Sequence, residues 1–410
     1  MSDQDGAGPA ERGRFQRTDE LTERALVVDA RAIARGDILP LAAGRTTFPR
    51  YIDRAAGAHL WDVDGNRYVD FLLGYGPVIL GHADPGIAAA ANAELERGVC
   101  FAPLWSPRQV ELAELLVDTI PGAERVLLLK TGSDATTAAV RLARIHTGRS
   151  VVVRSGYNGW HDWSVEQRAG VPDGVRRETI EFESSDLESL RSILADRGSE
   201  VACIVMMPCE DDVTSAEHLQ LVRDLAHSVG ALLVFDEMRS GFRLSSGGAQ
   251  QFFAVRADLA TFSKAMANGY TISAVTGSAE VFDGLGSTKV SSSFHVNPGD
   301  MAAAIGTITR LRDTDALERI WGMGRMFLDG LEQIVGELGI PAEVVGYPPM
   351  PFMRFLPSDS AADLSARFHR GVVERGVLLH PDHQWFISAA HTPFDIEEAL
   401  SVCRASLARL

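Results

Sequence analysis

The feature that most constrains the fold is the alternation of strand-like and helix-like segments between residues 125 and 276. Short apolar runs in this region have the length and composition of buried strands. Helical patterns at 134–147, 187–197 and 215–229 separate several of these runs. Such alternation predicts an α/β domain with a largely parallel sheet flanked by helices. The expected strands are 125–130, 151–154, 201–206, 231–235, 259–262 and 272–276.

The pattern changes outside this region and predicts a second, smaller domain. Residues 59–73 have the form of a hairpin around Asp64-Gly65-Asn66. After Pro298, helical stretches alternate with short strand-like pieces at 343–356 and 377–389. The expected division is an N-terminal segment, 1–85, that contributes to the small domain; a large domain, 86–297; and a small α+β C-terminal domain, 298–410.

Charge and composition narrow the classes of partner. The formal net charge of −16 argues against binding to nucleic acid or to an anionic membrane surface. No apolar run approaches the roughly 20 residues of a membrane-spanning helix, and the polar N-terminus lacks the apolar core of a signal peptide. The four cysteines form no CxxC pair, and no histidines have the spacing of a metal site. These features predict a cytoplasmic protein without metal, nucleic-acid or membrane partners.

Lysine is scarce, and one lysine has an unusual position. Only Lys130, Lys264 and Lys289 are lysines among 39 basic residues. Lys264 lies two residues after the end of the expected strand 259–262, where burial would disfavour its charged form. A lysine with a lowered pKa is a nucleophile that can form a Schiff base with an aldehyde cofactor. The alternative is an ordinary lysine at the end of an element, with its amine in water.

Other chemically useful residues also follow expected strands. Thr131-Gly132-Ser133-Asp134 joins a strand to a helix, and a helix N-terminus with a glycine suits a phosphate. Asp236 ends a buried strand, where a carboxylate needs a cationic or hydrogen-bonding partner. Tyr157 follows a third strand and could stack on a ring. The simpler alternatives are a helix cap, an ion-paired carboxylate and a loop aromatic. With Lys264, however, the set fits pyridoxal phosphate, whose ligands meet at the carboxyl ends of parallel strands.

Several longer motifs carry a resemblance to a known family. The sequence over about 50–410 resembles the class III, fold-type I aminotransferases, near the branch of glutamate-1-semialdehyde aminomutase. The resemblance implies a fold-type I transferase with a largely parallel sheet of the seven-stranded type, pyridoxal 5'-phosphate as cofactor, and a homodimer to which the segment 1–85 contributes. The motifs are LWDVDGNRYVDF (60–71), GPVILGHADP (76–85), KTGSDATTAAVRLARIHTGR (130–149), GYNGWHD (156–162), ALLVFDEMRSGFR (231–243), SKAMANGYTISAVTG (263–277) and SSSFHVNPGDMAAA (291–304).

The resemblance also implies roles for individual residues. Lys264 matches the lysine that holds the cofactor and moves the proton, and Asp236 matches the partner of the pyridine nitrogen. Ser293 matches a threonine that reaches the phosphate of the neighbouring subunit. Around the cofactor, the implied phosphate cradle is Gly132 and Ser133, the aromatic over the ring is Tyr157, and the residue beneath the ring is Met238.

Some positions depart from the family pattern. The histidine after Tyr157 is replaced by Asn158, and the usual EPV is Met207-Pro208-Cys209, so the contact to the cofactor's 3-hydroxyl is missing unless Glu210 provides it. The carboxylate-binding SPVR of the aminomutase is absent from the matching segment, 37–50, and its active-site glutamate aligns with His383. These losses count against the aminomutase reaction.

The sequence therefore predicts transamination from an amino-acid donor, with glutamate as first candidate, to an aldehyde or ketone. The acceptor is expected to be an amino sugar or a similar ring in secondary metabolism such as antibiotic biosynthesis. Two alternatives stay open: glutamate-1-semialdehyde 2,1-aminomutase, and a catalytically silent cofactor-binding regulator. The residues expected to shape the acceptor pocket are Tyr75, Trp105, Asp382, His383 and Trp385.

Overall fold

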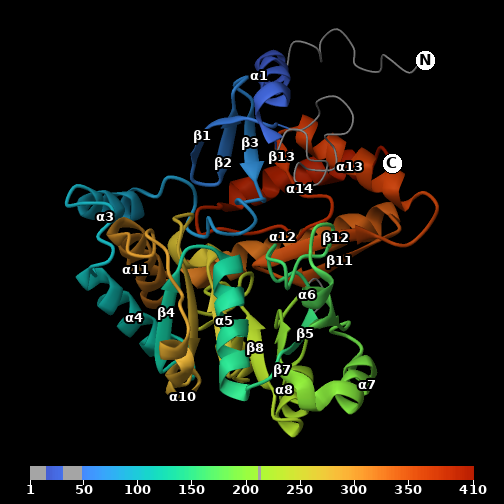
Figure 1. Cartoon of the computed structure of the whole chain (residues 1–410). Coiled ribbons are helices and arrows are strands. Elements are labelled where there is room, and N and C mark those ends of the chain that lie inside the picture. Colours follow the sequence, from blue (N-terminus) through green and yellow to red (C-terminus); the bar gives the residue numbers. More distant parts are fainter. Residues whose placement is uncertain (1–14, 31–48, 211–213) are drawn as a thin grey trace. The chain divides into compact units, whose positions relative to one another are not determined.

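The computed structural model describes residues 15–30, 49–210 and 214–410, which form two compact units. The larger unit consists of residues 76–80 and 85–319. The smaller unit contains the described residues up to Tyr75, residues 81–84 and residues 320–410. Figure 1 shows both, coloured along the sequence.

The larger unit is built on a seven-stranded sheet. In spatial order the strands are β4 (Arg125–Leu129), β10 (Ser273–Gly277), β9 (Leu259–Phe262), β8 (Leu232–Asp236), β7 (Val201–Met206), β5 (Val151–Ser155) and β6 (Thr179–Glu181). Strand β10 pairs antiparallel with both of its neighbours, and the pairs from β9 to β6 are parallel. The predicted α/β fold with a largely parallel sheet is therefore confirmed. The short edge strand β6 was not predicted.

Helices cover this sheet. Strands β5 and β7 are buried along their whole length, as expected for central parallel strands whose two faces are both covered. Helix α5 (Gly132–Thr147) packs against β7, β8, β9 and β10, and Figure 1 shows it lying across the sheet. The other helices of this unit are α3 (Pro85–Leu95), α4 (Pro107–Thr119), α6 (Asp173–Arg177), α7 (Leu187–Arg197), α8 (Ala216–Ser228), α9 (Gly248–Phe253), α10 (Ala279–Phe282) and α11 (Pro298–Asp313).

Helix α5 has well-defined ends. Thr131 caps its N-terminus in a reciprocal capping box with Asp134, and Gly148 ends it in the left-handed conformation. Its buried face is lined by alanines such as Ala135 and Ala139, which let the helix lie close to the sheet. The first turn of α5 is thereby fixed at the carboxyl end of β4.

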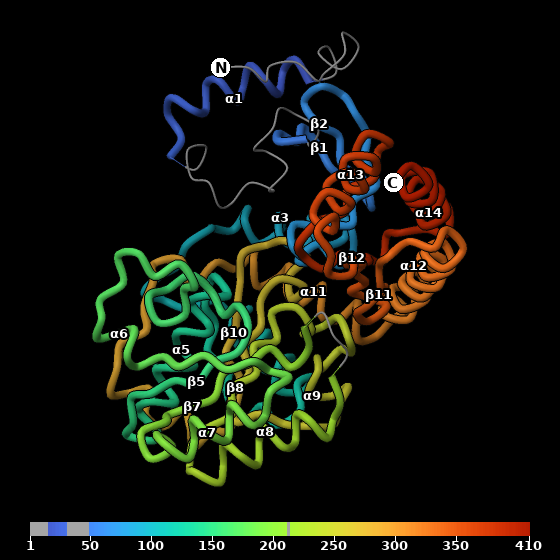
Figure 2. Tube along the Cα trace, turned by 90° about the vertical axis from the view of Figure 1, so that its right-hand side faces the viewer, coloured from blue at the N-terminus to red at the C-terminus, as the bar shows by residue number. Residues whose placement is uncertain are grey.

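The smaller unit joins the two ends of the chain. Hairpin strands β2 (His59–Asp62) and β3 (Arg67–Asp70) confirm the predicted turn at Asp64-Gly65-Asn66. Strand β13 (Val377–Leu378) pairs parallel with β3, and Figure 2 shows the blue N-terminal strands beside red C-terminal helices. The remaining elements are α1 (Gln16–Val28), β1 (Ile52–Ala56), α12 (Ala316–Leu338), β11 (Ala342–Tyr347), β12 (Met350–Phe355), α13 (Ala361–Glu374) and α14 (Pro393–Leu407).

Two details differ from the sequence-based expectation. The division after residue 297 is displaced, because α11 packs against α3 and α4 and belongs to the larger unit, so the change of unit falls after Arg319. The strand expected at 377–389 extends only over Val377–Leu378. The residues that follow are largely buried but irregular, with Trp385 and Phe386 inside the smaller unit. Apolar content predicted their burial but not their backbone conformation.

Candidate active site

Lys264 lies just beyond the carboxyl end of β9 in an uncommon backbone conformation. It opens the 3-10 turn η3 (Lys264–Ala267) with φ of +39°, in the left-handed region that non-glycine residues rarely occupy. The side chain is half-buried. Desolvation, reinforced by the cationic Arg239 and Arg243 and opposed by Asp236, lowers the pKa of Lys264 to about 7. A neutral, nucleophilic amine is therefore well populated at this position near neutral pH.

Asp236 lies at the same edge of the sheet as Lys264. It is the last residue of β8, which pairs in parallel with β9 so that Asp236 is opposite Thr261. Its side chain is buried, and its two oxygens accept hydrogen bonds from Asn158 Nδ2 (3.1 Å) and the Met238 backbone N–H (3.2 Å). Burial raises the pKa of Asp236, while these bonds and the charge of Lys264 act in the opposite direction.

The first turn of α5 offers backbone donors to an anion. The capping box uses the N–H groups of Thr131 and Asp134 and does not involve those of Gly132 and Ser133. Ser273 Oγ donates to the Thr131 carbonyl at 2.7 Å and ties this turn to β10. A Cβ on Gly132 would lie 2.9 Å from Met238 Sδ, so a larger residue there would displace the Met238 side chain. Free N–H groups at a helix N-terminus suit a phosphate.

The loop after β5 packs against this turn. Ser133 Oγ accepts a hydrogen bond from the Trp160 N–H at 3.3 Å. Gly159 has φ of +110°, and a Cβ there would lie 2.5 Å from Ser133 Oγ. Tyr157, in the same loop, is half exposed. Met238 thus contacts both Gly132, next to Ser133, and Asp236. Lys264 interacts with Asp236 through its charge, and Tyr157 lies on the adjoining loop.

The other two lysines have different surroundings. Lys130 Nζ donates to Asp300 Oδ2 at 2.5 Å and to the Thr271 carbonyl at 3.1 Å, which joins the end of β4 to α11. Lys289 is exposed. Lys264, by contrast, has a pKa displaced toward neutrality and a buried carboxylate, Asp236, as a charged neighbour.

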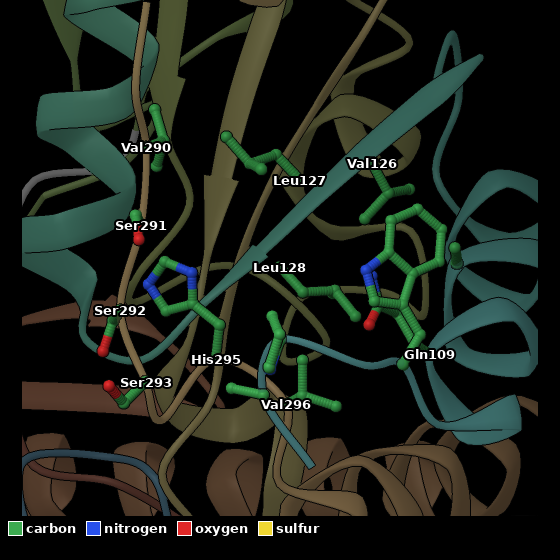
Figure 3. A pocket seen from close by; sticks show the side chains of 14 residues that line it. Gln109, Val126, Leu127, Leu128, Val290, Ser291, Ser292, Ser293, His295 and Val296 are labelled. Atoms are coloured by element: carbon green, nitrogen blue, oxygen red, sulfur yellow. The ribbon is translucent and has the colours of Figure 1, made fainter. Parts of the chain in front are cut away.

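Ser293 occupies a separate position. Its side chain is exposed on the segment after η4 (Asp283–Ser287), and its carbonyl accepts from Cys100 Sγ at 3.0 Å. It lines a cavity of about 570 Å³ together with Gln109 and His295, and Figure 3 shows this wall. Nothing within the described residues joins Ser293 to the first turn of α5.

The residues expected to shape an acceptor pocket do not form one group. Tyr75, His380 and His383 cluster in the smaller unit, with 5.0 Å between the Tyr75 and His383 ring centroids. Trp385 is fully buried and packs against Phe residues in the core of that unit, so its expected place in a pocket wall is wrong. Trp105 lines the cavity of Ser293. The segment 37–50, which replaces SPVR, lies outside the described residues except at its last two positions.

Sequence reasoning missed two buried charged groups near Asp236. Glu237 accepts hydrogen bonds from Ser240 Oγ and from the N–H groups of Ala249 and Gln250, and burial raises its pKa to about 7. Arg243 is fully buried, and its guanidinium donates to the Gly76 carbonyl. For Glu237, the available sequence signal was its place beside Asp236, as the second of two carboxylates at the end of an apolar strand. In the described part of the chain, no group of three acidic, histidine or cysteine side chains could hold a metal, and no helix is long and apolar enough to cross a membrane.

Fold and site together define a fold-type I transferase that uses pyridoxal phosphate. The family model "Aminotransferase class-III" matches residues 41–400, and the chain belongs to the class III aminotransferases. Pyridoxal phosphate is the cofactor of this class, and the chain is accordingly an enzyme. The predicted resemblance is confirmed.

Several relatives differ in what they act on. A 3-aminobutyryl-CoA aminotransferase of Cloacimonas acidaminovorans is 38% identical, with 88% of this chain and 90% of the relative covered. A 2'-deamino-2'-hydroxyneamine transaminase of Streptomyces kanamyceticus is 33% identical, with 88% and 92% covered. A glutamate-1-semialdehyde 2,1-aminomutase of Desulforamulus reducens is 32% identical, with 94% and 96% covered.

Solved structures agree with the fold. The internal aldimine form of the FumI protein of Sphingopyxis sp. MTA144 superposes with a TM-score of 0.89 at 30% identity, over 96% of each chain. An omega-transaminase from Sphaerobacter thermophilus gives a TM-score of 0.90 at 25% identity, over 98% of this chain and 100% of that one. Fold-type I architecture is therefore shared over nearly the whole length.

Proposed function

We propose that this enzyme transfers an amino group from an amino-acid donor, with glutamate as first candidate, to an aldehyde or ketone acceptor that carries no carboxylate beside its carbonyl. An amino sugar or similar polyhydroxylated ring is the acceptor class we favour. The observation that carries the transamination assignment is the pairing of Lys264, with its pKa near 7, and the buried Asp236 at one sheet edge. The class III family match supports an aminotransferase but does not identify the donor or the acceptor.

The chain's residues fit the cofactor in three places. Bound pyridoxal phosphate supplies an aldehyde that condenses with amines and a ring that accepts an electron pair. We assign the aldehyde to Lys264 and the ring nitrogen to Asp236, because a buried carboxylate is stabilised by a charge-assisted hydrogen bond to a protonated nitrogen. We assign the phosphate to the N–H groups of Gly132 and Ser133.

Lys264 also serves as the general acid–base. A group whose pKa lies near the operating pH can both take and return a proton. Lys264 Nζ, with a pKa of about 7, takes the proton from the donor's Cα and returns it at the cofactor's aldehyde carbon. Asp236 keeps the ring nitrogen protonated throughout. Met238, whose side chain lies against Gly132, and the half-exposed Tyr157 are the residues that would contact the cofactor ring.

Incubation with glutamate tests the reaction. A transaminase converts its cofactor to the amine form and releases 2-oxoglutarate in a single half-reaction. Absence of conversion with glutamate and with a panel of other amino acids, together with turnover of glutamate-1-semialdehyde, would support the aminomutase instead. The aminomutase is the second candidate because relatives with that name cover up to 96% of this chain. A catalytically silent regulator would neither convert its cofactor with an amino acid nor turn over glutamate-1-semialdehyde.

The proposed class of acceptor is based on the absence of the aminomutase's carboxylate-binding motif and on the substrates for which two relatives are named. Recognition of a carboxylate usually needs an arginine fork or a helix N-terminus. The aminomutase SPVR is absent, and His383 replaces its glutamate. His383 instead forms an aromatic cluster with Tyr75 and His380, which suits a polyhydroxylated or aminated ring. Two relatives are named for a coenzyme A thioester and for a neamine derivative.

Competing acceptors test this preference. We expect aldehyde-bearing sugars and cyclitols to be aminated faster than glutamate-1-semialdehyde, as followed by mass spectrometry of the products. Faster turnover of the semialdehyde than of every sugar would reject the preference and restore the aminomutase hypothesis. If a sugar is aminated, a role in antibiotic biosynthesis can be tested next, by disrupting the gene for this enzyme in the source organism.

We also propose that the enzyme is a cytoplasmic homodimer in which Ser293 reaches the phosphate bound by the partner subunit. This proposal is supported by the exposed position of Ser293 and by the exposed Phe294 beside it. Sedimentation equilibrium should give twice the 44.3 kDa mass of the chain.

Mixed dimers test the role of Ser293. Lys264→Ala and Ser293→Tyr should each inactivate the homodimer. A mixed dimer of the two should regain one working site, because the subunit with intact Lys264 then receives Ser293 from its partner. No regain of activity on mixing would reject the exchange between subunits.

A further inference from the structure

Asn158 is the buried neighbour of Asp236 that no assigned role explains. Its side chain is only 1% exposed, and its Nδ2 donates to Asp236 Oδ2 at 3.1 Å. The second oxygen of Asp236 accepts from the Met238 N–H at 3.2 Å. Each carboxylate oxygen therefore receives one hydrogen bond from the protein. Since a carboxylate oxygen has two lone pairs, one acceptor site on each oxygen is left by these two bonds for a ligand.

Two contacts fix the backbone of Asn158. Thr136 Oγ1, on α5, donates to the Asn158 carbonyl at 2.8 Å. The next residue, Gly159, lies so close to Ser133 that a Cβ would meet Ser133 Oγ at 2.5 Å. The amide is thus attached to the helix turn assigned to the phosphate, while its side chain reaches the carboxylate assigned to the ring nitrogen. Asn158 connects the two ends of the proposed cofactor site.

The orientation of the amide depends on the carboxylate. With Nδ2 toward Asp236, the Asn158 Oδ1 atom is buried and has no hydrogen-bond partner among the described residues. An unsatisfied buried oxygen is unfavourable, so the bond to Asp236 must outweigh it. That bond is strong only when Asp236 is ionised, since hydrogen bonds to a charged acceptor are about twice as strong as neutral ones. The charged side chains that act on Asp236 are Lys264, Arg239 and Glu237.

We propose that Asn158 is a positioning residue that keeps the Asp236 carboxylate ionised and directed at the ring nitrogen of the bound cofactor. The inference rests on the proposed role of Asp236. Because an amide does not titrate, its support of Asp236 is constant over the whole working range of pH. A histidine, which stands here in the family pattern, changes its charge near pH 6.5. This enzyme should therefore lack the additional transition near pH 6.5 that such a histidine would bring.

Three variants of the full-length, cofactor-loaded enzyme test the proposal. Asn158→Leu keeps the volume but removes the donor, Asn158→His restores a donor that titrates, and Thr179→Val is the control. Thr179 is likewise a buried polar residue of the same sheet, but it lies on the edge strand β6. The readouts are the dissociation constant of pyridoxal phosphate and the pH titration of the absorbance of the lysine-bound cofactor, neither of which needs turnover.

We expect Asn158→Leu to weaken pyridoxal phosphate binding about tenfold to a hundredfold, the range for loss of a hydrogen bond to a charged group. It should also shift the absorbance titration. Asn158→His should recover most of the affinity at low pH and add a transition near pH 6.5 that the parent lacks. Thr179→Val should match the parent in both measurements.

The proposal is overturned if Asn158→Leu binds the cofactor within twofold of the parent with an unchanged titration. If Asn158→Leu does not fold, the histidine variant decides, and absence of the added transition rejects the proposal. Asp236→Asn separates this failure from failure of the proposed function. If Asp236→Asn has the same absorbance titration as the parent, the proposed role of Asp236 itself is rejected. If the titration of Asp236→Asn changes but that of Asn158→Leu does not, only the role of Asn158 is rejected.

Discussion

Replacement of Lys264 by methionine should stabilise the cofactor-free protein near neutral pH. In the folded chain the pKa of the amine is lowered from an ordinary value of 10.5 to about 7, mainly by desolvation. Between these two values the unfolded chain binds more protons at this position than the folded chain. The free energy of unfolding of the parent therefore rises with pH through this window, and the penalty from Lys264 is greatest at and below pH 7.

The size of the effect follows from the shift. At pH 7 the folded amine is about half charged and the unfolded amine is almost fully charged, and at 1.36 kcal/mol per pKa unit this difference corresponds to about 4 kcal/mol. Methionine has a similar length and no charge, so its variant lacks this penalty. We expect the variant to be more stable than the parent by an amount of this order at pH 7, and the advantage to shrink toward zero near pH 10.5.

Urea unfolding of the cofactor-free parent and of Lys264→Met, at several values of pH from 7 to 10.5, measures this difference directly. Other titrating groups contribute to both proteins and largely cancel. Lys289→Met is the matched control, because Lys289 is exposed and its replacement should leave the pH dependence of stability unchanged. A difference between parent and Lys264→Met that stays flat across this range would refute the account of Lys264 as a desolvated amine.

Three further predictions concern the same site. Borohydride reduction of the loaded enzyme, followed by peptide mapping, should label Lys264, and label on either other lysine would remove its assignment. Asp236→Asn should keep the fold but lower turnover at least a hundredfold, so turnover within a few-fold of the parent would contradict its role. Gly159→Ala should lower the melting temperature more than Gly170→Ala. Both glycines have positive φ, which costs about 1–2 kcal/mol for alanine. Only at Gly159 would the added Cβ meet other atoms, with Ser133 Oγ at 2.5 Å. Overpacking of that kind typically costs a further 1–3 kcal/mol, and equal losses would show that the loop yields freely.

The sequence predicted the parts of the site that depend on one strand and its end. Lys264 and Asp236 each lie at the end of a largely apolar run, and parallel pairing of β8 with β9 brings them to one edge without any further information. The start of α5 was likewise predicted at residues 131–134, although its capping box between Thr131 and Asp134 was not. Local pattern and the general geometry of parallel sheets were sufficient for these positions.

Features that depend on contacts between distant segments were not accessible. The bond from Asn158 to Asp236 spans 78 positions, and no local pattern marks its donor. Trp385 was expected in a pocket wall because aromatic residues often bind rings, but its indole is buried among other aromatic side chains and donates to the His380 carbonyl. The domain boundary near α11 was misplaced for the same reason. The pattern of apolar and polar residues along a helix does not show which of two domains the helix packs against.

The ion pair of Lys130 with Asp300 has a practical consequence for chemical coupling. Amine-directed reagents attack neutral, accessible amines, and Lys130 is held by a carboxylate and a carbonyl in a largely buried position. In the loaded enzyme the assigned role of Lys264 occupies its amine as well. Lys289 is then the one lysine side chain open to a succinimidyl ester. Among the lysine side chains, attachment of a surface or a fluorophore would thus be directed to Lys289.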